Sequence, residues 1–417
     1  MSPDIFITGL DAVTPIGTGL DHFWKNLLAG KSGVDVQPLY AADEWPFAIG
    51  SAVTDFDPEK YLRPRKSLKF MCRAIQMGCV AAKLAADQAG LGPDSADPNR
   101  IATIIGADQF LAEPREFIDA FRVCSPNRKF DYRLIGQQGI KQIEPLLMLK
   151  YLPNMVATHI GISLDARGPT NTIVQRDVSA LIAILSSAEL LRRDWADIAI
   201  AGGTGTNLQP TNLIWNGTAG LSRRIHEPQQ ASRPFDALRD GWVNGEGSGA
   251  IVLETEISVR RRGVTPIARL SGWSHGFLPM SDPRFSDQVA RICAEAIARA
   301  GLQPIDIQQV NANGLSGVVE DHLESRAIQM ICPHAPVMAI KHHMGHLGTG
   351  ASIVELVAGV LAMRHGVIPG AINYMHPDPK CPINLSRHNR SEPQDNLLKL
   401  GFNSTGQIVA LVISRVL

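Results

Sequence analysis

The sequence predicts an α/β protein whose largely parallel sheet is covered by helices on both faces. Short apolar runs bounded by Gly, Asn or Asp have the length of buried strands. Longer segments with helical periodicity lie between them. Strands that alternate with helices indicate a parallel sheet, because parallel neighbours need a crossover connection, which is usually a helix.

The expected strands divide equally between the two halves of the chain. In the first half they are residues 5–13, 101–106, 172–175, 198–202 and 249–254. In the second half they are residues 267–272, 307–311, 337–340, 397–402 and 408–412. The clearest helices are expected at residues 67–88, 178–193, 286–300, 320–331 and 350–365. Five strands in each half predict an internal structural repeat.

The two halves are expected to be residues 1–256 and 257–417, joined by a solvated loop at Arg260-Arg261-Arg262-Gly263. No aromatic residues interleave these arginines, which favours a loop over a nucleic-acid patch. Residues 109–153 fit the repeat poorly and are rich in Phe and Leu. We interpret them as an insertion over the first half, where functional residues often lie.

Composition excludes several classes of function. Lys plus Arg and Asp plus Glu are balanced at 40 each, so no global charge attracts nucleic acid or an anionic membrane. No apolar run reaches the ~18 residues of a membrane span, and residues 1–4 carry no basic stretch. The six cysteines form neither a C-x-x-C pair nor a zinc pattern, so no metal is expected. They are typical of reduced thiols in a cytoplasmic protein.

The most specific motif spans residues 231–249 and reads ASRPFDALRDGWVNGEGSG. It resembles the block SRPFDxxRDGFVxGEGAG of β-ketoacyl synthases. Other segments resemble that family in the same order: Gly9 with Val13-Thr14-Pro15-Ile16-Gly17, Gly202-Gly203-Thr204, Val310-Asn311-Ala312, and Lys341 with Gly345-His346. The resemblance covers nearly the whole chain. It implies the thiolase-like fold, a duplicated αβαβα five-layer sandwich with mostly parallel five-stranded sheets, which dimerises through its central strands.

Active members of the family use a Cys-His-His set, and here the cysteine position falls on Asp177. None of the six cysteines lies within forty residues of it. A carboxylate is a far poorer acceptor for thioester exchange than a thiolate. Asp177 is therefore expected to be inactive and to serve as the N-cap of the helix at residues 178–193 or as a structural charge, the alternative being a covalent nucleophile.

The two histidine positions differ from each other. The first is occupied by Asn313, which can donate a hydrogen bond but cannot carry a proton as imidazole does. Asp321 and Glu324 keep the family's acidic spacing downstream and are expected to serve structure. Lys341 and His346 are retained, either as a half-site for carrier-bound malonyl or as a packed core pair.

The loop that gates substrate entry in the family, Gly-Phe-Gly-Gly-Thr-Asn, here has Phe402, Asn403 and Ser404 after Gly401. The paired glycines are lost, so the backbone is expected to be less mobile. Gly-Phe-Asn-Ser resembles the loop of chain-length factors, the cysteine-less subunits of type II polyketide synthases. Those subunits commonly carry Gln in place of the cysteine. Aspartate at that position and the retained His346 point to a divergent branch, such as those making polyenes or aryl polyenes.

The resemblance implies a non-condensing chain-length factor that pairs with a cysteine-bearing ketosynthase and completes its acyl tunnel. The expected partners are that ketosynthase and an acyl carrier protein, without nucleic acid or membrane. No cofactor is expected, since the acyl chain on the carrier's phosphopantetheine is substrate. Two alternatives stay open. One is a cysteine-independent malonyl-carrier decarboxylase or acyltransferase that uses His346 and Lys341. The other is a stand-alone protein that binds an acyl carrier or a lipid.

Two further sets of residues are implied by the family pattern. Bulky residues near the tunnel end would be Phe110, Leu111, Phe117, Phe121, Leu146, Leu147 and Met148, with the three phenylalanines roughly on one helical face. The alternative is that they pack the insertion onto the sheet. A basic patch for the acidic carrier would be Arg63, Arg65, Lys66 and Lys69. The alternative there is a solvated helix start.

Overall fold

The computed structural model describes residues 4–37 and 48–416, and its strands form two sets of five with the same order. The first set is β1 (Ile5–Thr14), β5 (Ile101–Ala107), β6 (Thr170–Ile173), β7 (Ile198–Thr206) and β8 (Glu246–Thr255). The second set is β9 (Ala268–Phe277), β10 (Gln309–Asn311), β11 (Val337–Met338), β14 (Asn396–Phe402) and β15 (Gln407–Arg415). The orders are β6-β5-β7-β8-β1 and β11-β10-β14-β15-β9, each reading third, second, fourth, fifth, first. The predicted internal repeat is confirmed.

Within each set the strands point mostly the same way. β5 is parallel to β6 and β7, whereas β8 is antiparallel to both β7 and β1. The second set repeats this pattern, with β15 as the reversed strand. The sets join where β1 pairs with β9 at Phe6↔Arg269 and Ile7↔Ala268. Every strand expected from the sequence is present.

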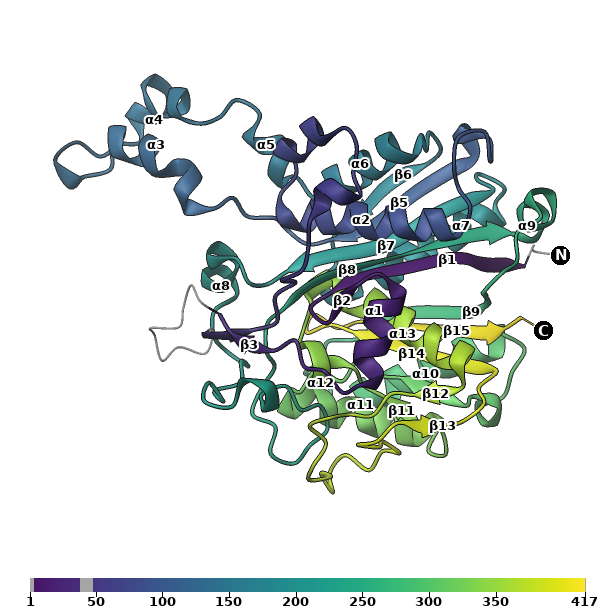
Figure 1. The fold of residues 1–417 in the computed structure, drawn as a ribbon. Helices are drawn as coiled ribbons and strands as arrows, with labels where there is room; N and C mark the ends of the chain where they lie inside the picture. Colours follow the sequence, from purple (N-terminus) through teal and green to yellow (C-terminus); the bar gives the residue numbers. More distant parts are fainter. Residues whose placement is uncertain (1–3, 38–47, 417) are drawn as a thin grey trace.

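Helices divide the molecule into five layers (Figure 1). α7 (Ser179–Arg192) and α13 (Ala351–His365) lie between the two sets of strands, while α2 (Arg73–Gln88) and α6 (Met155–Leu164) cover the first set. α10 (Phe285–Arg299) packs on the second set, with α11 (Val318–Ile331) against it. α13 is buried from Ala351 to Met363, as expected for a helix that is apolar on all sides.

The remaining elements are short. The helices are α1 (Leu20–Leu28), α3 (Ile118–Val123), α4 (Arg133–Gln137), α5 (Leu147–Tyr151), α8 (Pro210–Asn216), α9 (Glu256–Arg262) and α12 (Lys341–Met344). The strands are β2 (Gly17–Thr18), β3 (Asp35–Val36), β4 (Ile49–Gly50), β12 (Val367–Ile368) and β13 (Arg390–Ser391). No helix within residues 4–37 and 48–416 is both long enough and apolar enough to cross a membrane. Of residues 1–4, only Asp4 belongs to the described part.

The insertion carries α3 and α4 on an arm that projects from the body (Figure 1). The expectation that its three phenylalanines share one helical face is wrong. Phe110 lies in an irregular segment after β5, Phe117 ends the 3-10 turn Pro114–Phe117, and Phe121 lies in α3. Pro114 explains the difference, because proline disfavours helical backbone in the residue before it.

Two other expectations need correction. The helix expected at residues 67–88 is a 3-10 turn, Arg65–Phe70, followed by α2 from Arg73. The expected arginine loop is the last turn of α9, which starts with Thr255 accepting a hydrogen bond from the backbone N–H of Ser258. Its Arg262 is buried against Glu254 at 2.9 Å rather than solvated.

Candidate functional site

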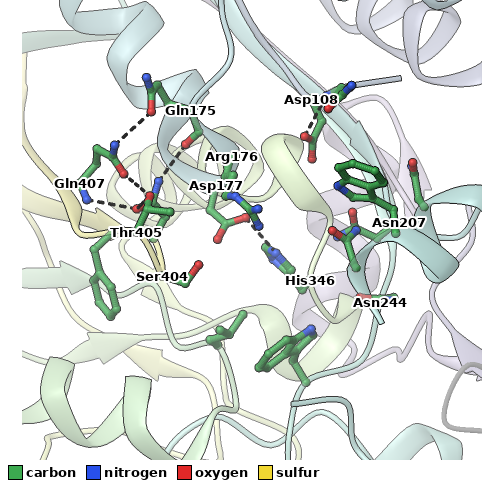
Figure 2. Close-up of a pocket in the computed structure, with 18 of the residues that line it drawn as sticks. Asp108, Gln175, Arg176, Asp177, Asn207, Asn244, His346, Ser404, Thr405 and Gln407 are labelled. Carbon is green, nitrogen blue, oxygen red and sulfur yellow. Dashed lines mark hydrogen bonds and ion pairs between the residues drawn. The ribbon is translucent and has the colours of Figure 1, made fainter. Parts of the chain in front are cut away.

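A cavity of about 550 Å³ opens where β5, β14 and the turn before α7 meet (Figure 2). Its wall brings together residues from both halves of the chain. Among them are Asp108, Asp177, Asn313, His346, Phe402 and Asn403. The structure therefore places the three positions of the family's Cys-His-His set, here Asp177, Asn313 and His346, and the gate loop around one cavity.

Asp177 lies in the 3-10 turn Arg176–Val178, immediately before α7. Of its two expected structural roles, capping α7 is wrong, because the N-cap residue is Val178 and makes no side-chain cap. The turn directs the Asp177 side chain into the cavity instead, where its Oδ1 lies 3.0 Å from Nε2 of His346 (Figure 2). The nucleophile position thus holds a carboxylate tied to the retained histidine.

The surroundings of Asp177 keep it ionised. Burial raises the pKa of its carboxyl group, but the His346 charge and hydrogen bond, with Lys341 and Arg176, outweigh that effect and lower the pKa below its usual value. An ionised carboxylate with a low pKa is a weak nucleophile toward a thioester. The geometry offers no thiolate in its place.

The cysteines cannot supply the missing thiolate. All six are buried, and none lines the cavity. Burial raises the pKa of Cys72 to about 11 and that of Cys332 to about 12, and it also raises the pKa values of Cys79 and Cys293. A thiol whose pKa lies that high is almost entirely protonated near neutral pH.

Backbone pairing fixes His346. Its N–H donates to the carbonyl of Val243 at 2.8 Å, and its carbonyl accepts from the N–H of Gly245 at 2.8 Å. Gly345 precedes it with φ 60°, and a Cβ there would lie 2.6 Å from the Val243 carbonyl oxygen. Only glycine fits this turn. The motif at residues 231–249 thus positions His346 through backbone hydrogen bonds of Val243 and Gly245.

Lys341 does not face the cavity but joins a buried charge network. Its ammonium group donates to the carbonyl of Asn313 at 2.5 Å and pairs with Glu355 of α13. The other oxygen of Glu355 lies 2.5 Å from the Lys399 ammonium group of β14. Both lysines and the glutamate are almost fully buried. We call Lys341, Glu355 and Lys399 the buried triad.

The triad also orients Asn313. The side-chain oxygen of Asn313 lies 3.2 Å from the Lys341 ammonium group. Because an ammonium group only donates hydrogen bonds, the oxygen is assigned to that side of the amide, and the NH₂ group is turned toward the cavity. Glu324 accepts the backbone N–H groups of Asn313 and Gly314 at 2.6 and 2.8 Å. Asp321 accepts those of Phe235 and Ser316. The two acidic residues hold loops, as their structural interpretation requires.

The side chain of Asn403 makes most of the hydrogen bonds that hold the gate loop. Asn403 donates to the carbonyl of Gln175 at 3.0 Å. Its Oδ1 accepts the Thr405 hydroxyl at 2.8 Å and the backbone N–H groups of Gly406 and Gln407 at 3.1 Å each. Gln407 adds a side-chain bond of 3.1 Å to Gln175 (Figure 2). Asn403 therefore both closes the loop on itself and fastens it to the turn that carries Asp177.

Replacing Asn403 by Gly is expected to loosen this loop. The variant loses four hydrogen bonds and gains backbone freedom. Amide exchange in peptides covering residues 397–407 and 173–177 should accelerate about tenfold or more, measured by hydrogen–deuterium exchange and mass spectrometry. Ser404→Gly is the matched control, since Ser404 is exposed and its side chain makes no hydrogen bond within the described residues. Equal exchange in both variants would contradict the assignment.

The predicted tunnel residues fall into three groups. Leu111 lines the cavity. Phe110 and Leu147 are buried in the core of the first half, and Phe117 is half-buried there. Phe121, Leu146 and Met148 are exposed. Within the described part of one chain, Leu111 alone of this set reaches the cavity.

The predicted docking residues Arg63, Arg65, Lys66 and Lys69 are all exposed around the 3-10 turn Arg65–Phe70. Arg65 makes an ion pair of 3.3 Å with Glu59, and the Lys69 ammonium group lies 4.7 Å from the centre of the Phe70 ring. The turn is therefore a solvated basic surface.

Sequence reasoning missed four residues of the site. Asp108 follows β5 directly, and position at the carboxyl end of a strand was a usable signal. Arg176 adopts φ 52° beside Asp177, which no pattern indicated. Glu355 was visible as the sole charge in residues 351–363, an otherwise apolar helix. Lys399 gave no signal, because a lysine in a short strand is ordinarily placed at the solvent.

The two equivalent sets of strands, with α7 and α13 packed between them, are the arrangement of the thiolase-like fold. Residues 2–257 match the β-ketoacyl synthase N-terminal domain, and residues 270–375 match the C-terminal domain. The chain belongs to the β-ketoacyl synthase family.

Individual relatives agree with this assignment. The 3-oxoacyl-[acyl-carrier-protein] synthase 2 of Synechocystis sp. is 30% identical, over 99% of this chain and 98% of that protein. A putative polyketide β-ketoacyl synthase 1 of Streptomyces halstedii is 28% identical, over 99% and 98%.

Solved structures share the fold. A β-ketoacyl synthase from Burkholderia phymatum superposes with a TM-score of 0.88 at 24% identity, and the ishigamide ketosynthase/chain length factor with 0.86 at 23%. Each covers 100% of both chains.

Proposed function

We propose that this chain is a non-condensing chain-length-factor subunit, which pairs with a cysteine-bearing ketosynthase and shapes its acyl tunnel. The observation that carries the proposal is Asp177 at the nucleophile position, bound to His346 at 3.0 Å. Covalent acyl transfer needs an activated nucleophile beside a base. Here His346, which would act as the base, is bound to the Asp177 carboxylate instead, and the rest of the fold is intact.

The gate loop supports the same proposal. A condensing subunit must open this loop to admit acyl chains, whereas Asn403 fastens it to the Gln175 carbonyl at 3.0 Å. A subunit that only forms a tunnel wall has no need of that motion. The exposed basic turn at Arg63, Arg65, Lys66 and Lys69 suits an acidic carrier protein as a second partner.

The alternative, a malonyl-carrier decarboxylase using His346 and Lys341, has weaker support. The Lys341 ammonium group is buried against Glu355 and Asn313 rather than turned to the cavity. The Asp177 carboxylate would repel the carboxylate of a malonyl group placed near His346.

The proposal predicts that this chain resists acylation while its partner accepts the acyl group. The chain is co-expressed with a homologue that keeps the family cysteine, purified, and mixed with an acyl-carrier thioester. Intact-protein mass spectrometry should show an adduct on the partner and none on this chain. Asp177→Cys alone should not restore condensation, because Asn313 and the fastened loop remain.

Two results would contradict the proposal. One is a stoichiometric acyl adduct on this chain. The other is failure of the two chains to elute together in size-exclusion chromatography while this chain alone releases a condensed product.

A further inference from the structure

A second cavity, of about 400 Å³, lies at the opposite end of α7 from the candidate site. The two cavities share no lining residue. Asp177 precedes the first residue of α7, whereas Arg192, which lines the second cavity, is its last residue. A helix of 14 residues spans about 20 Å. The second cavity is therefore a separate feature of the molecule.

This cavity forms where β9 runs past the end of β1. β1 begins at Ile5 and pairs with β9 only at Phe6↔Arg269 and Ile7↔Ala268, so the later residues of β9 extend beyond it. Residues 270–273 of β9 make one wall. The last turns of α7 and α10 contribute Arg192 and Arg299. Two helix ends thus bring two arginines to the same cavity.

Both arginines contact Trp273. The guanidinium group of Arg192 lies over the Trp273 ring, 5.5 Å from its centre. Nη1 of Arg299 donates to the Trp273 carbonyl at 2.8 Å. A guanidinium group has five N–H donors, so each arginine can serve more than one acceptor. Trp273 therefore holds one guanidinium group on its ring side and another on its backbone side.

The charges around the cavity leave an excess of positive charge. Arg192 pairs with Glu189 at 3.3 Å, and Asp4 on the cavity wall pairs with Arg269 at 3.7 Å. Both pairs are partly exposed, so an anionic ligand can compete with them. Within residues 4–37 and 48–416, Arg299 makes no ion pair with an acidic side chain. The cavity therefore favours an anion.

We propose that this cavity binds a small organic phosphate monoester, whose phosphate contacts Arg299 and lies in the field of Arg192. A phosphate carries three acceptor oxygens and a charge of about −1.5 to −2, which suits guanidinium groups. The volume is that of a small-molecule site and leaves room for an apolar body against Trp273 and Leu270. The inference goes beyond the proposed function and does not rest on it.

The test uses the full chain, with any partner that co-purifies, and isothermal titration calorimetry. The probe is phenyl phosphate. Inorganic phosphate lacks the apolar body, and benzyl alcohol lacks the charge. We expect saturable binding of phenyl phosphate, about tenfold weaker binding of inorganic phosphate, and no binding of benzyl alcohol.

Arginine variants assign the binding to this cavity. Arg299→Gln should weaken phenyl phosphate binding about tenfold or more, and Arg192→Gln about threefold or more. Arg291→Gln, on the same helix as Arg299, and Arg193→Gln, directly after Arg192, are the matched controls. Both control residues are exposed and line neither cavity, so their variants should bind like the unmodified chain.

Trp273 gives a readout that does not depend on the arginine variants. Binding of phenyl phosphate should change the tryptophan fluorescence of the chain. Trp273→Phe should remove most of that change while binding persists in the calorimeter, because phenylalanine keeps an aromatic ring in the wall. A fluorescence change of the same size in Trp273→Phe would place the ligand elsewhere.

Three further results would overturn the inference. They are no saturable binding of phenyl phosphate, binding of benzyl alcohol with equal affinity, or unchanged affinity in both Arg299→Gln and Arg192→Gln. Pairing with a ketosynthase tests the proposed function separately, and its success or failure does not bear on any of these results.

Discussion

Replacing Glu355 by Gln is expected to lower the free energy of unfolding by about 3–5 kcal/mol. Glu355 is the carboxylate that pairs directly with both buried ammonium groups, those of Lys341 and Lys399. Without it two cations remain buried near each other. Burial already lowers the pKa of Lys399, and Lys341 lowers it further, against the pull of Glu355. Urea unfolding followed by circular dichroism measures the change.

Two controls separate this effect from a general loss of charge. Glu392→Gln removes a glutamate from a partly exposed pair with Arg390 and should cost below about 1 kcal/mol. Adding Lys399→Met to Glu355→Gln should recover part of the loss, because only one buried cation is then left unpaired. A double variant as unstable as the single one would show that the triad is not held by shared charge.

Replacing Phe110 by Ala is expected to destabilise the chain by about 3–5 kcal/mol. Phe110 is 6% exposed and packs in the core formed by α2, β5 and α6, where the smaller side chain leaves a cavity. Phe121→Ala is the matched control. Its ring is 51% exposed and touches Phe117 and Phe130, so about 1 kcal/mol is expected.

The same variants distinguish core packing from tunnel closure. Leu111→Ala, at the cavity wall, should change product length in a complex with a ketosynthase while leaving it stable. Phe110→Ala should give less complex and less of the same product. A stable Phe110→Ala complex that makes longer products would instead place Phe110 at the tunnel end.

The gate and the charge network share one consequence. Asn403 fastens β14's end to the turn of Asp177, and the triad fastens β14 to α13 and the Asn313 turn. The proposed function does not need the gate loop to open, and Asn403 holds that loop to the Gln175 carbonyl. The held gate loop and the loss of the nucleophile therefore support the same proposal.

The sequence by itself determined the architecture. Apolar runs and helical periodicity are local signals, and β1, β5, β7 and α13 fall where those signals lie. The motif of residues 231–249 and the Gly345-His346 pair likewise identify the family, because their backbone geometry demands particular residues. The replacement of cysteine by Asp177 needed no structure to be seen.

Only the tertiary structure decided what the replaced residues do. Asp177 was expected to cap α7, but the 3-10 turn aims its carboxylate at His346, which lies far away in the chain. Lys399 acquires its role from Glu355, a partner in another element. Side-chain pairing between distant segments leaves no periodic trace, because its strength depends on distance and burial, which the folded chain alone sets.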